Sequence, residues 1–269
     1  MGVLDRRQVL VVGASAGIGR AFAGHAAREG AHVLAVARRA ERLAELAQET
    51  KEAPGTIDTL AADISDEDDC RRIGERARDL LGEIDVVLHS AAMSPLKRFR
   101  DTTADDWRTV LATNLIGVHQ MIAAVLPSVA PTGIVGVLSS ETIGQPRAGL
   151  GAYSASKAAL EESVRCWHCE HPGIRFSVVA VGSTVPTEFG HSFDLTLLTE
   201  LMNEWALHGL AQSSFMDTEE VGKFLVQMYA AALPFAQVNI EYLMLRSPSG
   251  LMADAQKMID HAEATIPGD

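Results

Sequence analysis

The amino-acid sequence predicts an α/β protein in which a doubly wound parallel sheet of about seven strands carries helices on both faces. Short runs rich in Val, Ile and Leu alternate with longer stretches of helical periodicity. The short runs are apolar throughout, which is typical of parallel strands buried on both faces. No Pro- or Ser-rich linker divides the chain, so residues 1–269 are expected to form a single domain.

The predicted elements alternate from the N-terminus onward. The strands are predicted at residues 8–12, 32–37, 56–61, 86–90, 134–139, 175–181 and 238–245. The helices are predicted at residues 17–29, 40–51, 67–81, 103–126, 152–171 and 218–232. Such units join parallel strands through right-handed crossovers. Helices at 194–208 and 253–264 fall outside the alternation, the second within an expected C-terminal extension at 249–269.

Charge and cysteine content restrict the partners and the compartment. The formal net charge of −12 argues against nucleic acid, because no basic excess is present to neutralise phosphates. The cysteines Cys70, Cys166 and Cys169 are sparse and odd in number, so a cytoplasmic, reducing setting is expected. No stretch approaches the run of about 20 apolar residues that a membrane helix needs, and no membrane partner is expected.

A glycine-rich turn joins the first predicted strand to the first predicted helix. Gly13, Gly17 and Gly19 have the spacing Gly-x-x-x-Gly-x-Gly. Gly13 can adopt the positive φ of a tight turn, Gly17 lets a pyrophosphate approach the backbone, and Gly19 lets the helix pack closely on the sheet. A plain turn would use the same glycines, but the strand before it and the helix after it favour a dinucleotide site.

The end of the second strand indicates which dinucleotide binds. NAD-specific sites carry an acidic residue there for the ribose 2′-hydroxyl, whereas this chain has Ala37 followed by Arg38 and Arg39. Guanidinium groups suit a 2′-phosphate, and Ser15 can hydrogen-bond it. NADP(H) is therefore favoured and NAD(H) remains open, with solvated arginines at a helix start as the alternative.

A tyrosine and a lysine lie one helical turn apart in Tyr153-Ser-Ala-Ser-Lys157. Tyrosine, with a pKa of about 10, serves as a general acid/base near neutral pH when its pKa is lowered, and a nearby ammonium group has that effect. Ser140 precedes Tyr153 at the end of a strand, where an open sheet binds its ligand, and its hydroxyl can donate to a developing oxyanion. Asn114 lies inside a predicted helix, where asparagine is unfavourable.

These motifs resemble the short-chain dehydrogenase/reductase family, which has a Rossmann-type fold. The resemblance implies an NAD(P)(H)-dependent oxidoreductase that transfers hydride between the nicotinamide and a carbonyl or alcohol substrate. It implies a catalytic tetrad of Asn114, Ser140, Tyr153 and Lys157. Tyr153 would be the general acid/base, Lys157 would also hydrogen-bond the nicotinamide ribose, and Asn114 would hold a water in a proton relay.

The resemblance also implies cofactor contacts. It places Asp63 beside the adenine with Ile64 over the ring, although Asp63 is also explained as a helix cap. His89-Ser-Ala-Ala92 replaces the family's Asn-Asn-Ala-Gly but keeps small residues for a close approach. Thr187 matches a threonine that contacts the nicotinamide carboxamide. The expected cofactor-binding residues are Gly13, Ser15, Gly17, Ile18, Gly19, Arg38, Arg39, Asp63, Ile64, Ser90, Ala91, Ala92, Tyr153, Lys157 and Thr187.

Residues 188–216 interrupt the alternation directly after the sixth predicted strand. Asp194 can begin a helix there and Gly209 can end it. An apolar face is predicted at Leu195, Leu198, Leu201, Met202 and Trp205, and a polar face at Thr199, Glu200, Asn203 and Glu204. The segment is expected either to be a lid over a hydrophobic substrate or only to pack on the domain or a neighbouring subunit.

Two alternative functions have less support in the sequence. A metal site at Cys166-Trp-His-Cys169-Glu-His171 is not expected, because metals need three or four convergent ligands. A non-catalytic dinucleotide sensor or scaffold could use the same fold, but such relatives typically lack the tyrosine or lysine that this chain keeps. The family resemblance further implies a homodimer or homotetramer.

Overall fold

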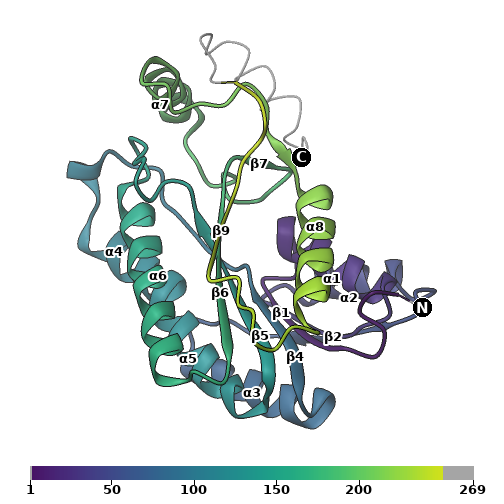
Figure 1. Cartoon of the computed structure of the whole chain (residues 1–269). Coiled ribbons are helices and arrows are strands. Elements are labelled where there is room, and N and C mark those ends of the chain that lie inside the picture. Colours follow the sequence, from purple (N-terminus) through teal and green to yellow (C-terminus); the bar gives the residue numbers. More distant parts are fainter. Residues whose placement is uncertain (1, 251–269) are drawn as a thin grey trace.

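The computed structural model describes residues 2–250 and contains two sheets (Figure 1). The strands of the larger sheet are β1 (Gln8–Val12), β2 (His32–Ala37), β3 (Thr56–Ala61), β4 (Ile84–His89), β5 (Val129–Ser140), β6 (Arg175–Val181) and β9 (Tyr242–Leu245). This seven-stranded sheet has the order β3-β2-β1-β4-β5-β6-β9, and all neighbouring strands are parallel. The order reverses between β1 and β4, where an open sheet forms its ligand crevice. The predicted fold class is confirmed.

Helices cover both faces of this sheet (Figure 1). One face carries α1 (Gly17–Arg28), α2 (Ala40–Glu49) and α8 (Thr218–Ala232). The other carries α3 (Glu67–Leu81), α4 (Ala104–Leu111), α5 (Gly117–Val125) and α6 (Gly151–Glu170). Each face has its own buried core: Phe22 meets Tyr229 on the first, with ring centroids 6.1 Å apart, and Ile73 and Met121 are buried on the second. Burial of both sheet faces explains why the strand sequences are apolar throughout.

The helix predicted at residues 103–126 is not continuous. A π-helical turn, η2 (Ala112–Ile116), separates α4 from α5, and a short 3-10 turn, η3 (Leu126–Ser128), follows. Asn114 in η2 is fully buried and exchanges two hydrogen bonds with the backbone of Met93. The long-range contact of this side chain explains the irregular turn, because π-bulges commonly serve to present a functional residue.

Among the described residues, one helical stretch, Ala104–Ser128, is long and apolar enough to cross a membrane. Its elements α4 and α5 pack on α6 and α3 respectively, within one helical layer of the sheet. Core helices of soluble proteins pass the same test of length and composition, so this stretch is weak evidence for a membrane span.

The largest differences in strand boundaries from the prediction are at the starts of β5 and β9. β5 begins at Val129 instead of residue 134, across a register shift against β4. β9 begins at Tyr242 instead of residue 238, because the Val238 amide donates to the Phe235 carbonyl in a turn. The predicted helix at 253–264, with most of the expected extension at 249–269, lies outside the described residues.

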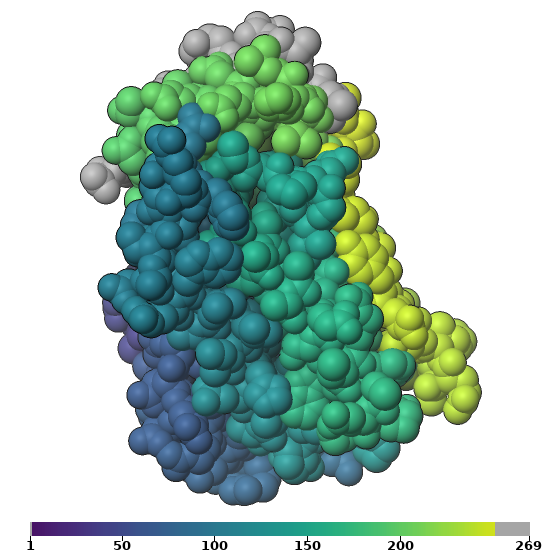
Figure 2. All heavy atoms as spheres, turned by 90° about the vertical axis from the view of Figure 1, so that its left-hand side faces the viewer, coloured from purple at the N-terminus to yellow at the C-terminus, as the bar shows by residue number. Residues whose placement is uncertain are grey.

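The segment predicted as a lid stands beyond the carboxyl ends of the strands. Its helix, α7 (Leu195–Leu207), begins at the predicted cap Asp194, which accepts from the Leu197 amide, and Gly209 follows it with φ +65°. A small parallel sheet of β7 (Thr184–Val185) and β8 (Met216–Asp217) joins the two ends of the segment. In the space-filling view the green segment covers this end of the molecule (Figure 2).

Candidate active site

A cavity of about 680 Å³ lies at the carboxyl ends of the central strands. It is lined by the loops that follow β1, β2, β3, β4, β5 and β6, and by side chains of α6 and of the segment before β8. All expected catalytic and cofactor-binding residues line it except Gly19 and Asn114. The fold therefore brings to one cavity residues that are separated by up to about 170 positions in the sequence.

The glycine turn has the geometry that its sequence predicts. Gly13 has φ +91°, and a Cβ on it would lie 2.5 Å from the backbone nitrogen of Ala91. Gly17 has φ +55°, and a Cβ there would lie 3.6 Å from the Thr187 side chain. A Cβ on Gly19 would lie 2.3 Å from the Gly13 carbonyl, so Gly19 serves close packing of α1 on β1 and does not face the cavity.

The first turn of α1 is open to an anion. Ala16 precedes the helix without a side-chain cap, and the first turn contains no acidic residue. Ala16, Gly17 and Ile18 all line the cavity. Free N–H groups and the positive end of the helix dipole favour a phosphate at such a position. The residues present therefore fit the pyrophosphate of a dinucleotide.

The two arginines after β2 have different environments. The Arg38 side chain is 76% exposed, with its Nη1 3.8 Å from Asp63 Oδ2. Arg39 pairs with Glu188 and donates from Nη2 to Ser15 Oγ at 3.0 Å. The Asp63 carboxylate also accepts from the Ser65 amide and hydroxyl, so this residue organises the turn before α3 whether or not it meets an adenosine.

Ser140, Tyr153 and Lys157 lie together on the opposite part of the lining. The Ser140 hydroxyl accepts from Thr142 Oγ1 at 3.1 Å, and its interaction with Tyr153 lowers the pKa of the phenol. Lys157 Nζ lies 5.9 Å from the centre of the Tyr153 ring and donates to the Leu138 carbonyl at 2.8 Å. Ser140 at the end of β5 and Tyr153 and Lys157 in the first turns of α6 thus bring two hydroxyl groups and an ammonium group to the same part of the cavity.

Ser139, the neighbour of Ser140, makes a different contact. Its hydroxyl donates to Glu161 Oε1 at 2.6 Å, and both residues are buried. Glu161 lies one turn after Lys157 on α6. Its negative charge favours the protonated lysine and opposes the lowering of the Lys157 pKa.

The electrostatics of the pair differ from the expectation that Lys157 lowers the pKa of Tyr153. Burial raises the pKa of Tyr153 to about 12, and only the Ser140 hydroxyl and the charge of Arg147 act in the opposite direction. Burial lowers the pKa of Lys157 to about 8. Lys157 is not among the causes of the Tyr153 shift; desolvation, which was not visible in the sequence, dominates for this buried phenol. The expected lowering also relied on the positive charge of an oxidised nicotinamide, so it stays a prediction for the cofactor complex. Tyr153 is a neutral phenol at pH 7.

Asn114 supports the cavity from behind. Its Oδ1 accepts from the Met93 amide at 2.9 Å, and its Nδ2 donates to the Met93 carbonyl and to Ser156 Oγ at 2.8 and 3.0 Å. Both amide donors are therefore used by protein groups. The asparagine fixes the loop after β4 against α6, and it reaches the cavity through Met93, which lines it.

His89 occupies the end of β4, where the sequence departs from the family's asparagine. It is fully buried, and its Nε2 donates to the Ala91 carbonyl at 2.9 Å. Burial, and secondarily the charge of Lys157, lowers the pKa of His89 to about 3, so the imidazole is neutral. It holds the small-residue turn that follows β4, which keeps this wall of the cavity open for close approach.

Sequence reasoning missed a buried ion cluster beside the tyrosine. Arg147 lines the cavity, pairs with the buried carboxylate of Glu141 and donates to the Leu210 carbonyl at 3.0 Å. Arg246 Nε lies 2.9 Å from the other oxygen of Glu141. Glu141 and Arg147 are six positions apart, but Leu210 and Arg246 are distant from both in the sequence, so no local pattern could have indicated the whole cluster. It connects the loop after β5 with the end of the segment that contains α7.

The apolar side of the cavity comes largely from that segment. Leu198, Met202 and Trp205 of α7 line it, and Trp205 Nε1 donates to the Ala148 carbonyl at 2.9 Å. Leu201 packs beneath them against Leu96 and Leu150. The predicted apolar face is present with one correction: Leu195, at the first position of α7, is 67% exposed, because the packed surface meets the helix only from Leu197 onward.

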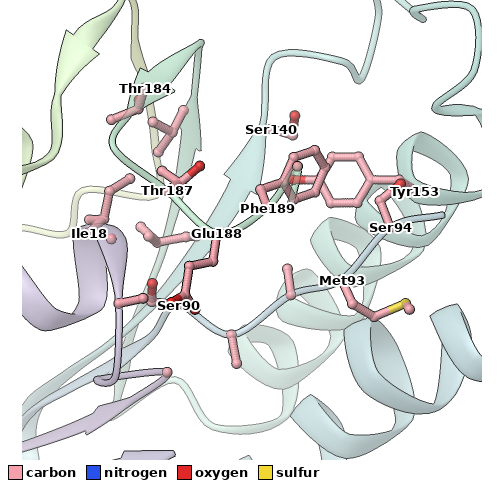
Figure 3. Close-up of a pocket in the computed structure, with 18 of the residues that line it drawn as sticks. Ile18, Ser90, Met93, Ser94, Ser140, Tyr153, Thr184, Thr187, Glu188 and Phe189 are labelled. Carbon is pink, nitrogen blue, oxygen red and sulfur yellow. The ribbon is translucent and has the colours of Figure 1, made fainter. Parts of the chain in front are cut away.

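The predicted polar face of α7 also makes a specific contact. Glu204 receives two hydrogen bonds from Arg98, at 2.6 and 2.7 Å. Phe189, which the sequence did not single out, places its ring beside Tyr153 with centroids 4.8 Å apart (Figure 3). The segment thus covers the tyrosine with an aromatic ring while Arg98 holds its helix to the loop before α4.

Comparisons with known proteins agree with this geometry. The sequence profile of the short chain dehydrogenase family matches residues 7–196, more than half of the chain. A 3-oxoacyl-acyl-carrier-protein reductase of Thermotoga maritima is 31% identical over 83% of this chain and 90% of its own length. A glycine betaine reductase of Emericella nidulans is 29% identical over 87% of this chain, which spans 18% of that much longer protein.

A solved structure shares the fold. The alcohol dehydrogenase of Thermococcus sibiricus, complexed with 5-hydroxy-NADP, superposes with a TM-score of 0.77 at 24% identity, covering 91% of this chain and 97% of that one. At this identity the likeness shows the fold alone, whereas the family profile and the bacterial reductase extend the agreement to the amino-acid sequence. The chain therefore belongs to the short-chain dehydrogenase family of NAD(P)-dependent oxidoreductases.

Proposed function

We propose that this protein is an NADP(H)-preferring oxidoreductase that interconverts a hydrophobic carbonyl compound and its alcohol, with Tyr153 as the general acid/base. One observation carries the proposal. A single cavity joins the glycine turn and Arg38 to Ser140, Tyr153 and Lys157. A cofactor whose phosphates bind at the glycine turn and Arg38 would direct its nicotinamide toward Ser140, Tyr153 and Lys157.

The bound nicotinamide supplies or accepts the hydride. In carbonyl reduction, the Ser140 and Tyr153 hydroxyls hold the substrate oxygen, and Ser140 stabilises the charge that develops on it. Tyr153 transfers its phenolic proton to that oxygen. Because burial raises the pKa of Tyr153 to about 12, the residue is protonated at neutral pH, which suits the reductive direction. Lys157 faces the phenolate that remains and favours it electrostatically.

The preference for NADP(H) rests on the lining near β2. Ala37 offers no carboxylate for a ribose hydroxyl, whereas Arg38 is exposed at the cavity edge and Arg39 and Ser15 are already hydrogen-bonded to each other. These cations matter more in a chain with a net charge of −12, because the remaining surface repels a phosphate.

The substrate class rests on the opposite part of the lining. Met93, Leu150, Phe193, Met202 and Trp205 all contribute apolar surface near Tyr153. Such a wall favours an apolar ketone or alcohol over a sugar, and the segment at 188–216 acts as a lid that excludes water during hydride transfer. The protein is proposed to be cytoplasmic and a homodimer or homotetramer, as in its family. A non-catalytic sensor is not favoured, since Tyr153 and Lys157 both face the cavity.

A panel of carbonyl substrates tests the proposal directly. Purified protein is incubated with NADPH or NADH and with aliphatic ketones, aromatic ketones, aldehydes and keto sugars, and the absorbance of the reduced nicotinamide is followed. Turnover of bulky apolar carbonyls with NADPH is expected. Tight binding of NADPH without turnover of any compound would favour the sensor, and a best substrate that is strongly polar would remove the lid hypothesis.

A further inference from the structure

An ion pair at the cavity joins the loop after β2 to the start of the lid. Arg39 Nη1 donates to Glu188 Oε1 at 2.8 Å, and Nη2 contacts the second carboxylate oxygen closely. The two residues are 149 positions apart and both line the cavity. The guanidinium lowers the pKa of the Glu188 carboxyl below its ordinary range, so the glutamate is charged at neutral pH.

The same guanidinium is bound to the glycine turn. Its Nη2 also donates to Ser15 Oγ at 3.0 Å, so Glu188 and Ser15 hold the fork of Arg39 between them. Arg39 and Ser15 are two of the donors proposed for the 2′-phosphate. A carboxylate and a phosphate both accept two parallel hydrogen bonds from a guanidinium, and one fork cannot serve both anions fully.

We propose that Glu188 sets cofactor selectivity by competing with the 2′-phosphate of NADP(H) for Arg39. This inference rests on the proposed NADP(H) function. A 2′-phosphate that binds Arg39 must displace the Glu188 carboxylate from the guanidinium. NADH carries no phosphate there and can leave the pair in place. Glu188 therefore weakens NADPH binding relative to NADH and moderates the selectivity that the arginines provide.

The test measures the ratio of the dissociation constant for NADH to that for NADPH, because an effect that is common to both cofactors cancels in this ratio. NADPH and NADH are titrated into the wild-type protein and Glu188→Gln, and nicotinamide fluorescence reports binding without turnover. The variant should raise the ratio of the NADH constant to the NADPH constant about two- to fivefold, the range for partly exposed ion pairs. An unchanged or lowered ratio overturns the proposal.

A second background shows whether Glu188 acts through Arg39. In Arg39→Gln, adding Glu188→Gln should leave the ratio unchanged, because the competition has lost its target. An equal rise in that background means direct repulsion of the phosphate and overturns competition. Glu204→Gln is the matched control: it breaks a similar ion pair on α7, with Arg98, and should not alter the ratio.

Failure of the inference is distinguishable from failure of the proposed function. If the wild-type protein binds NADPH and NADH equally, and neither Arg38→Gln nor Arg39→Gln changes that, the site does not recognise a 2′-phosphate and both proposals fall. If the arginine variants reduce selectivity while Glu188→Gln does not alter it, only the role of Glu188 is refuted. Thermal unfolding of each variant, expected near wild type, identifies folding defects, and Glu188→Ala provides a second variant with the same expected rise.

Discussion

Replacing Lys157 with methionine is expected to stabilise the protein while abolishing its activity. The lysine is 2% exposed, and burial lowers its pKa from 10.5 to about 8. Below pH 8 the lysine is charged in both the folded and the unfolded chain. At about 1.4 kcal/mol per pKa unit, burying that charge lowers the free energy of unfolding by about 3 kcal/mol. Methionine has no charge to bury and fills a similar volume. Losing the hydrogen bond to Leu138 costs about 1 kcal/mol, so a gain of about 2 kcal/mol is expected at pH 7.

The pH dependence identifies the cause. Between pH 8 and 10.5 the unfolded chain binds this proton and the folded chain releases it, so wild-type stability rises with pH over that window. The advantage of Lys157→Met should therefore shrink as pH rises from 7 to 10. Urea unfolding at both pH values, with exposed Lys223→Met as control, measures the difference. A variant that is less stable than wild type at pH 7, or a pH-independent difference, would refute the reasoning.

Three further variants test the cofactor turn, the nucleotide preference and the lid. Gly13→Ala places a Cβ 2.5 Å from the backbone of Ala91 at a φ of +91°, and urea unfolding should show a loss of about 2–4 kcal/mol in the free energy of unfolding. Gly144 is the control, because its φ is also positive, +81°, but no atom lies within 4 Å of the added Cβ. Gly144→Ala should therefore lose only about 1–2 kcal/mol. Arg38→Asp should weaken NADPH binding about tenfold, the scale of one charge-assisted hydrogen bond at an exposed site, and leave NADH binding nearly unchanged by fluorescence titration; an equal loss for both would count against 2′-phosphate recognition. Trp205→Ala should lower kcat/KM for bulky apolar substrates without changing NADPH affinity, while Leu207→Ala, at a residue that is 85% exposed, should alter neither; wild-type kcat/KM in Trp205→Ala would exclude the lid role.

The sheet and the glycine turn were predictable because their determinants are local. Buried parallel strands need apolar side chains on both faces, and the strand before Gly13 and the helix after it identify the turn. The resemblance to the family assigns Ser140 to the tetrad, and in the structure the neighbouring Ser139 donates to Glu161 while Ser140 lies at the cavity with Tyr153.

What the sequence did not reveal depends on contacts between distant segments. The π-helical turn follows from the bonding of Asn114 to Met93, which no helical periodicity encodes. The pairing of Arg39 with Glu188 joins two cavity-lining segments that are 149 positions apart in the sequence. The direction of the Tyr153 pKa depends on the balance between burial and charge, and the depth of burial becomes known only when the fold is known.

The central claim is that Tyr153 transfers the proton within this cavity, and Tyr153→Phe tests it most directly. The substitution removes the phenolic hydroxyl and keeps the ring that packs beside Phe189. With the best carbonyl substrate and saturating NADPH, kcat should fall by about 10²- to 10⁴-fold. The dissociation constant for NADPH should rise by no more than about tenfold, which is the upper range for the loss of one hydrogen bond to the cofactor. A variant that retains near-native kcat with undisturbed NADPH binding would contradict the assignment of Tyr153 as the general acid/base.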